Sequence, residues 1–96
     1  MAKVAVIGCG HWGKNLVRNF AELGALVAIS DLNSELAAQF SIQFNLPALD
    51  FDAILVGDCD GVVIAAPAPL HASLSKKALV AGKHVYVEKF LTSIFF

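Results

Sequence analysis

Short apolar runs alternate along the chain with longer segments in which apolar residues recur at helical spacing. The apolar runs are too short for helices and are rich in β-branched residues, so they predict buried strands. Turn-forming residues follow most of them. The predicted strands are Lys3–Ile7, Leu26–Ile29, a brief extended piece near Ala48–Leu49, Val62–Ala66 and Val85–Val87.

The segments between these strands predict helices. A first helix runs from His11 to Leu23 and a second from a cap at Asn33 or Ser34 towards Pro47. Two further helices are expected at Asp50–Val56 and His71–Ala81. The apolar faces of the first two comprise Leu16, Val17, Phe20 and Leu23, and Leu36, Ala37, Phe40 and Phe44; Gly57–Gly61 is a predicted turn, and Pro67 and Pro69 a predicted loop.

Regular alternation of strands and helices with short connections is typical of an α/β domain with a parallel sheet and right-handed crossovers. We therefore expect one Rossmann-like domain over residues 1–96. The sheet should hold about five strands in the order 3-2-1-4-5, with helices on both faces.

Composition agrees with a single compact domain. The 96 residues are 57% hydrophobic and 16% charged, which excludes intrinsic disorder. The net charge of −1 gives no reason to expect nucleic acid or an anionic membrane surface as a partner. The central uncharged stretch is broken by prolines and is too short to cross a bilayer. Cys9 and Cys59 are too few for a disulfide framework and are expected to be buried thiols in a reducing cytoplasm.

A glycine motif of the form G-x-G-x-x-G joins the first strand to the first helix. Gly8 permits a tight turn, Gly10 allows a pyrophosphate to approach the backbone, and Gly13 allows the helix to pack closely against the strand. The helix N-terminus then offers N–H groups and a positive dipole to phosphates. The motif predicts dinucleotide binding; a tight turn without a ligand is the alternative.

Asp31 ends the second strand and follows Gly13 at close to the spacing of about 20 residues that is expected for the ribose-binding acidic residue. A carboxylate accepts hydrogen bonds from ribose hydroxyls and repels a 2′-phosphate. Leu32 and Asn33 supply no positive charge for such a phosphate, so NAD is favoured over NADP. A turn or helix-capping aspartate is the alternative interpretation of Asp31.

Other residues of interest also lie near strand ends. His11 and Trp12, inside the glycine loop, are expected to pack over the edge of the cofactor or over the first helix rather than to do chemistry. His71 opens a helix beyond Pro67 and forms either a helix N-terminal turn or a wall of the nicotinamide pocket. Lys89, in the pair Glu88-Lys89 after the last strand, is either a polar strand exit or a proton-transfer group beside the cofactor.

Three separated motifs together resemble the N-terminal domain of the glucose-fructose oxidoreductase/inositol dehydrogenase family. They are Ala5–Asn15, Ala66–His71 and Ala81–Lys89. The resemblance covers nearly the whole chain and, more weakly, favours members that act on nucleotide-linked sugars. It implies hydride transfer between NAD(P) and a carbohydrate hydroxyl carbon.

The resemblance also implies roles for residues of this chain. Gly8, Gly10 and Gly13 would hold the pyrophosphate, Asp31 the adenosine ribose, Pro67 and His71 the nicotinamide side, and Glu88 the nicotinamide ribose, while Lys89 would be the catalytic lysine. The family's proline after that lysine is Phe90 here, and from the length of the chain we expect the family's larger substrate domain to be absent. We expect a truncated or frameshifted relative or a fragment, inactive alone; the alternatives are a non-catalytic dinucleotide-binding or sensor module, or a non-functional truncated product.

The end of the chain predicts self-association. The last predicted strand lies at the edge of the sheet, where its backbone groups lack a partner. Apolar residues follow it at Phe90, Leu91 and Ile94–Phe96. We expect two copies to pair through this strand and the residues after it, whereas a tail folded back over its own sheet would give a monomer.

Overall fold

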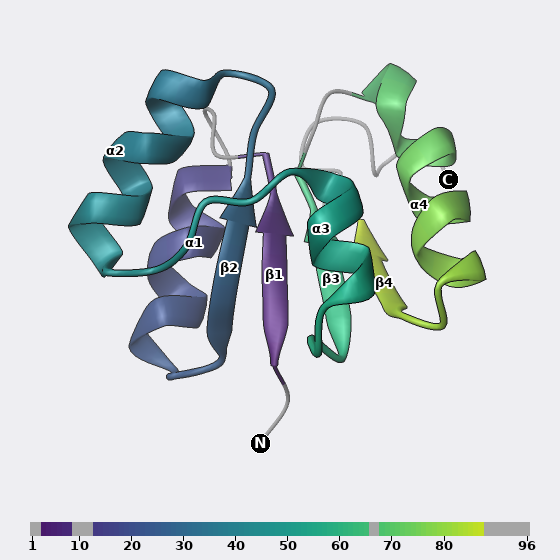
Figure 1. Ribbon diagram of the computed structural model, residues 1–96, viewed down its shortest axis with the longest axis horizontal. Helices are drawn as coiled ribbons and strands as arrows, with labels where there is room; N and C mark the ends of the chain where they lie inside the picture. The colour runs from purple at the N-terminus through teal and green to yellow at the C-terminus, as the bar shows by residue number, and fades with distance from the viewer. Residues whose placement is uncertain (1–2, 9–12, 66–67, 88–96) are drawn as a thin grey trace.

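The computed structural model describes residues 3–8, 13–65 and 68–87 of the chain, arranged as a parallel sheet with helices on both faces (Figure 1). The sheet has four strands in the order β2-β1-β3-β4. The strands are β1 (Val4–Ile7), β2 (Leu26–Ser30), β3 (Gly61–Ile64) and β4 (His84–Val87). The helices are α1 (Gly13–Glu22), α2 (Ser34–Phe44), α3 (Phe51–Val56) and α4 (His71–Val80), with a 3₁₀ turn, η1 (Ala68–Leu70), before α4.

The α/β class and the order of these four strands are confirmed, but the prediction of about five strands is wrong. The piece near Ala48–Leu49 forms only one isolated parallel bridge, between Ile29 and Ala48, on the outer side of β2. The N–H of Ile29 donates to the Pro47 carbonyl at 3.1 Å, and the N–H of Leu49 donates to the Ile29 carbonyl at 2.9 Å. Proline before the bridge and the cap of α3 after it leave no room for a longer strand.

The boundaries of the elements near β3 also differ from the prediction. β3 begins at Gly61 and ends at Ile64, because it pairs in register with β1, which ends at Ile7. Pro69, expected in a loop, lies in the 3₁₀ turn η1. Leu23, predicted to lie on the apolar face of the first helix, is 65% exposed because α1 ends at Glu22.

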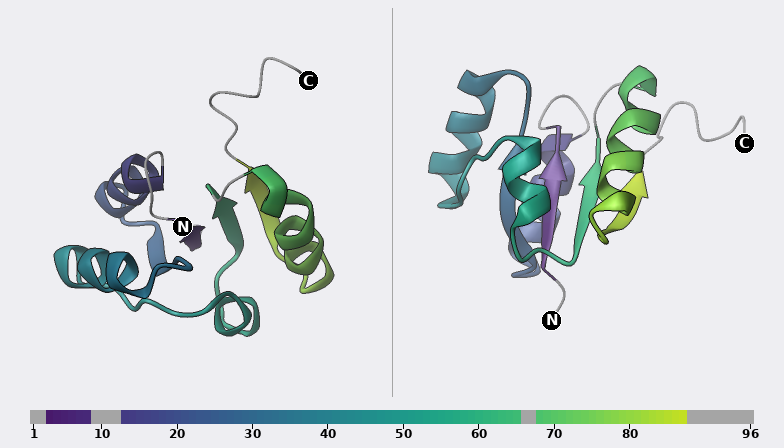
Figure 2. Two further views of the ribbon diagram at one scale, coloured as in Figure 1. Left: turned by 90° about the horizontal axis from the view of Figure 1, so that it is seen from above. Right: turned by 45° about the vertical axis from the view of Figure 1, so that its right-hand side comes forward.

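The side chains that pack on the two faces of the sheet form separate cores. We call the face that carries α3 and α4 the front and the face that carries α1 and α2 the back (Figure 2). This division follows from right-handed crossovers, which place connections towards β2 and connections towards β4 on opposite faces. The front core comprises Ala5, Ile7, Ala28, Ile54, Cys59, Val62, Ile64 and Ala78; the back core comprises Val6, Val17, Leu26, Ile29 and Val63.

Side-chain caps define where two helices begin. The side-chain oxygen of Asn33, one of the two predicted candidates, accepts a hydrogen bond from the N–H of Leu36 at 3.1 Å. A carboxylate oxygen of Asp50 accepts one from the N–H of Ala53 at 2.8 Å. Each cap satisfies an N–H that the helix itself leaves without a partner.

Polar contacts join the loops at the amino ends of the strands. Lys3 Nζ lies 3.2 Å from a carboxylate oxygen of Asp58, and the backbone N–H of Lys3 donates to Asp60 at 2.8 Å. Lys83 Nζ donates to the carbonyls of Gly57 at 2.8 Å and Cys59 at 2.7 Å. These contacts tie the start of β4 and the start of β1 to the loop before β3.

The thiol of Cys59 is free and buried, as predicted, whereas Cys9 lies outside the described residues. Within the described part of the chain, no helix has the length and apolar character needed to span a bilayer.

Candidate functional site

Three neighbouring strands end side by side at the carboxyl edge of the sheet. Gly8 follows β1, Asp31 follows β2 and Ala65 follows β3. The N–H of Gly8 donates to the Ser30 carbonyl at 2.7 Å, and the N–H of Ala65 donates to the Ile7 carbonyl at 2.8 Å. In open α/β sheets, ligands bind at this edge where connections diverge to opposite sides, as they do here on either side of β1.

Gly13 lies closely against the backbone of Gly8 at this edge. Gly8 has φ 101°, a left-handed conformation that side chains with a Cβ rarely adopt. A Cβ added to Gly13 would lie 1.8 Å from the Gly8 carbonyl oxygen and 2.7 Å from its carbon, so no side chain fits there. The tight turn and the close approach of helix to strand that the motif predicted are therefore present.

Gly10, His11 and Trp12 lie outside the described residues, so their predicted contacts with a cofactor stay predictions. The helix that follows is described from Gly13, and its N-terminus lies against the end of β1. A helix N-terminus at a strand end is the geometry in which backbone N–H groups and the helix dipole favour phosphate.

Asp31 is half-buried directly after β2, on the strand next to Gly8. One of its carboxylate oxygens accepts a hydrogen bond from the N–H of Asn33 at 2.8 Å. The interpretation of Asp31 as a turn residue is thus correct, and it does not exclude ribose binding, because a carboxylate has about four acceptor positions. Leu32 is 92% exposed and Asn33 caps α2, so the turn itself carries no positive side chain.

The residues predicted for the nicotinamide side are only partly described. His71 is the first residue of α4 and is half-buried; α4 begins at the same edge of the sheet at which β1 and β2 end (Figure 1). Pro67, Glu88 and Lys89 lie outside the described residues. The structure thus brings Gly8, Gly13 and Asp31 together, and it brings the start of α4 to the same edge.

Two contributors to this edge were not singled out from the sequence. The buried Ser30 supplies the carbonyl that fixes Gly8, and the Cβ of Ala65 lies 3.5 Å from the position that a Cβ on Gly13 would occupy. Both act through strand register, and the only sequence signal was a small residue at the end of β2 and another directly after β3. The described residues contain no cluster of three or more side chains suited to a metal ion.

Comparison with known proteins agrees with this geometry. Residues 2–94 match the family model GFO_IDH_MocA, described as an oxidoreductase family with an NAD-binding Rossmann fold. Among curated proteins, the UDP-N-acetylglucosamine 3-dehydrogenase of Acidithiobacillus ferrooxidans is 30% identical over 91% of this chain and 28% of its own length. The dTDP-3,4-didehydro-2,6-dideoxy-alpha-D-glucose 3-reductase of Actinomadura kijaniata is 38% identical over 95% of this chain and 29% of its own.

Solved structures give the same result. The A. ferrooxidans enzyme superposes with a TM-score of 0.85 at 32% identity, over 91% of this chain and 28% of that one. The scyllo-inositol dehydrogenase of Lactobacillus casei, solved with NAD(H) and scyllo-inositol, superposes with a TM-score of 0.83 at 27% identity, over 93% of this chain and 28% of that one. The chain thus spans little more than a quarter of the length of these relatives.

Proposed function

The chain belongs to the GFO_IDH_MocA oxidoreductase family with its NAD-binding Rossmann fold, and from this membership we propose that it binds NAD at the carboxyl edge of its sheet. The backbone of Gly8, Gly10 and Gly13 lies along the pyrophosphate, and the N-terminus of α1 points towards it. Asp31 accepts hydrogen bonds from the adenosine ribose. His11 and Trp12 pack over the edge of the cofactor.

The observation that carries this proposal is the contact between Gly13 and the Gly8 carbonyl. Because a Cβ at Gly13 would lie 1.8 Å from that oxygen, glycine is required to seat α1 directly on the end of β1. This close seating leaves backbone, rather than side chains, facing a phosphate group. Asp31 ends the adjacent strand, on the side towards which an adenosine would extend.

The preference for NAD over NADP rests on the turn after β2. The Asp31 carboxylate attracts ribose hydroxyls and repels a 2′-phosphate, and Leu32 and Asn33 offer no compensating charge. The matching residues of the family motifs complete the site: Pro67 and His71 lie on the nicotinamide side, and Glu88 lies near the nicotinamide ribose.

We propose that the reaction of the complete enzyme is hydride transfer with a sugar or nucleotide sugar. The bound nicotinamide would supply the hydride donor or acceptor. Lys89 would hydrogen-bond the substrate hydroxyl and move its proton. Support comes from the named substrates of the relatives, among them UDP-N-acetylglucosamine and inositol.

Titration calorimetry of the 96-residue chain with NAD and with NADP tests the binding proposal. We expect NAD to bind more tightly, and Asp31→Asn to weaken it by roughly 10- to 100-fold, as for the loss of a hydrogen bond to a charged group. Asn keeps one oxygen for the N–H of Asn33, but it removes the charge and replaces the other acceptor oxygen with an NH2 donor. Asp50→Asn is the matched control, because Asp50 also accepts a backbone N–H at 2.8 Å but caps α3.

Equal affinity for NAD and NADP in the unchanged chain would show that the assignment of Asp31 is wrong. Equal losses in Asp31→Asn and Asp50→Asn would show that the effect comes from helix capping or folding. No heat of binding with either dinucleotide, from a chain whose circular dichroism shows the α/β fold, would refute the site itself.

A non-catalytic binding module is the second candidate, because the described residues that meet at the carboxyl edge, Gly8, Gly13 and Asp31, are all ones expected to bind a dinucleotide. The chain spans 28% of the length of the relative that it matches, and hydride transfer also needs a group that orients the sugar. Misplacement of a reacting group by about 1 Å can cost on the order of 100-fold in rate. We expect no sugar-dependent reduction of NAD by this chain; turnover that Lys89→Ala abolishes would exclude the module.

Two further proposals concern the state of the protein. The free buried thiol of Cys59 fits the reducing cytoplasm, where we place the protein. We also propose that the chain self-associates through β4 and the residues after it, and the surface that would support this association is described next.

A further inference from the structure

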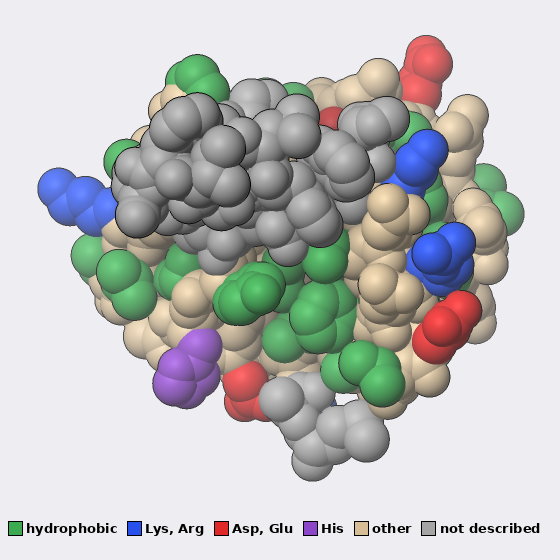
Figure 3. Space-filling view, turned by 180° about the vertical axis from the view of Figure 1, so that it is seen from behind, with side chains coloured by type: hydrophobic (Ala, Val, Ile, Leu, Met, Phe, Trp, Pro, Cys, Tyr) green, Lys and Arg blue, Asp and Glu red, His purple; other side chains and the backbone are tan. Residues whose placement is uncertain are grey.

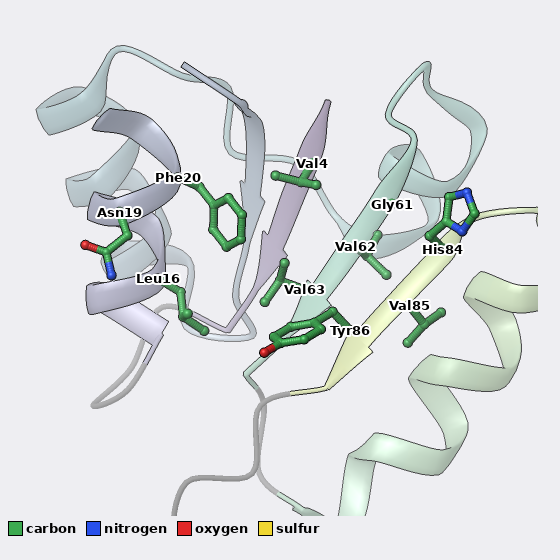
Figure 4. A pocket seen from close by; sticks show the side chains of 10 residues that line it. All are labelled: Val4, Leu16, Asn19, Phe20, Gly61, Val62, Val63, His84, Val85 and Tyr86. Carbon is green, nitrogen blue, oxygen red and sulfur yellow. The ribbon is translucent and has the colours of Figure 1, made fainter. Parts of the chain in front are cut away.

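A groove of about 490 Å³ lies on the back of the sheet between α1 and β4 (Figure 4). One wall is α1, from which Leu16 and Phe20 point towards the strands; the floor is formed by β1, β3 and β4. The other side is the outer edge of β4. The groove is lined by Val4, Leu16, Asn19, Phe20, Gly61, Val62, Val63, His84, Val85 and Tyr86.

The register of the strands explains why the groove is hollow. Val4, Gly61 and His84 lie next to one another across the sheet, and Gly61 contributes no side chain to this row. A Cβ on Gly61 would lie 3.0 Å from the His84 carbonyl oxygen and 3.2 Å from its Cβ. The next back-facing row contains Tyr86, which is 61% exposed despite its position on a strand.

The lining of the groove does not suit a dinucleotide or a sugar. It contains no Asp, Glu, Lys or Arg, and only Asn19, His84 and the Tyr86 hydroxyl offer polar side-chain groups. Apolar side chains gather at the centre of this face (Figure 3). The groove reaches the amino ends of the strands, whereas the cofactor edge lies at their carboxyl ends. Its chemistry fits an apolar segment of protein.

The outer edge of β4 adjoins the groove. Within the described residues β4 pairs only with β3, so the other side of β4 presents backbone N–H and C=O groups without a strand partner. The front of β4 is covered by α4, which leaves this edge and the groove as one continuous exposed surface. Edge strands of this kind readily pair with another chain.

We propose that this surface binds a second copy of the same chain. The two β4 edges pair antiparallel about a two-fold axis, and the residues that follow β4 in each copy fill the groove of the other. Residues 90–96 lie outside the described residues, but they begin close after β4, which lines the groove, and none of them is charged; their apolar members are Phe90, Leu91, Ile94, Phe95 and Phe96.

A second copy would both fill the groove and pair with the outer edge of β4, whereas the chain's own tail would only fill the groove. If residues 90–96 folded back into the groove of their own chain, the outer backbone groups of β4 would remain without a strand partner. Exchange between two copies fills both grooves and also pairs both edges. Exchange of an identical element is a common route to two-fold dimers.

Sedimentation of the full chain at micromolar concentration tests the proposal. We expect twice the 10.2 kDa mass of one chain. Tyr86→Lys should weaken association at least about tenfold, because it places a charge in the apolar groove. Leu79→Lys is the matched control: Leu79 is 62% exposed, like Tyr86, but it lies on α4 away from the groove, so association should be unchanged.

A chain shortened after Glu88 separates exchange from other forms of association. We expect it to sediment as a monomer, with an α/β circular dichroism spectrum that shows folding. A full-length monomer, equal effects of Tyr86→Lys and Leu79→Lys, or undiminished association of the shortened chain would each overturn the proposal. Affinity for NAD should not change in Tyr86→Lys, so failure of this proposal and failure of cofactor binding are distinguishable.

Discussion

The back of the sheet has two halves that differ in burial, although the strands of both halves are rich in apolar residues. Over β1 and β2, α1 packs closely, and Val6 and Val17 are fully buried. Over β3 and β4 lies the groove, in which Tyr86 is 61% exposed. The front of the same two strands is covered, because α3 and α4 bury Val62 and Ile64 there.

The difference shows that the path of the connections, rather than the hydrophobicity of the strands, determines which surface is buried. The connection from β1 to β2 places α1 on the back, and the connection from β2 to β3 begins with α2 on the back, near β2. That second connection then places α3 on the front, and the connection from β3 to β4 places α4 there too. Right-handed crossovers impose this arrangement. No described helix therefore covers the back of β4, whatever its residues.

The largest expected effect is the difference in lost stability when a glycine of each half is replaced by alanine. Gly13→Ala should lower the free energy of unfolding by about 3 kcal/mol or more, because its Cβ would lie 1.8 Å from backbone oxygen and would unseat α1. Gly61→Ala should change it by less than about 1 kcal/mol, because its nearest contact is 3.0 Å and the back of β4 is open. Urea denaturation followed by circular dichroism measures both; a similar loss in both would mean that the halves are packed alike.

The next comparison removes one apolar side chain from each half. Val17→Ala should cost roughly 2 kcal/mol at any protein concentration, since Val17 is fully buried within one chain. Tyr86→Ala should cost less than about 0.5 kcal/mol in dilute solution. Its cost should grow with protein concentration if Tyr86 acts in the dimer. Thermal unfolding over a range of concentrations distinguishes the two, and a Val17→Ala effect that varies with concentration would contradict the assignment.

A smaller effect concerns what holds β4 in the open half. Lys83, just before β4, donates to the carbonyls of Gly57 and Cys59. Lys83→Met should lower the free energy of unfolding by roughly 1 kcal/mol, at the low end for bonds to a charged group because the site is partly exposed. Lys76→Met, on the exposed face of α4, serves as the control and should change it by less than about 0.5 kcal/mol. Faster hydrogen exchange in β4 of Lys83→Met would locate the loss.

The smallest effect lies where the loop before β3 meets the start of β1. A hydrogen bond and the charge of Lys3 hold the pKa of Asp58 below its ordinary value. The stability from this lowered pKa is present at neutral pH and is lost as the pH falls through the lowered value. We expect an NMR titration to show the low pKa, and Lys3→Gln or high salt to bring it back towards the ordinary value. An unchanged pKa in Lys3→Gln would contradict this assignment.

Much of the fold and part of the site were predictable from local patterns. The apolar spacing located α2 and its inward face, and composition offered Asn33 as one of two candidate caps. The cap at Asp50 was not predicted, because Asp50 was assigned to the helix itself. The prediction was wrong where tertiary contacts set the boundaries. The piece near Ala48 is a single bridge rather than a strand, and β3 ends where its partner β1 ends. In the site, the motif identified Gly8 and Gly13, but only strand register shows that Ser30 and Ala65 adjoin them.

The amino-acid sequence by itself determined the alternation of elements, the glycine turn after β1 and the acidic residue after β2. These features depend on neighbouring residues, through backbone conformation, capping and periodicity. Only the tertiary structure decided which side of each strand is covered, because that depends on where helices distant in sequence come to lie. The groove beside Tyr86 and the hydrogen bond from Gly8 to the Ser30 carbonyl are both of this kind: each is a contact, or the lack of one, between elements that the chain brings together only on folding.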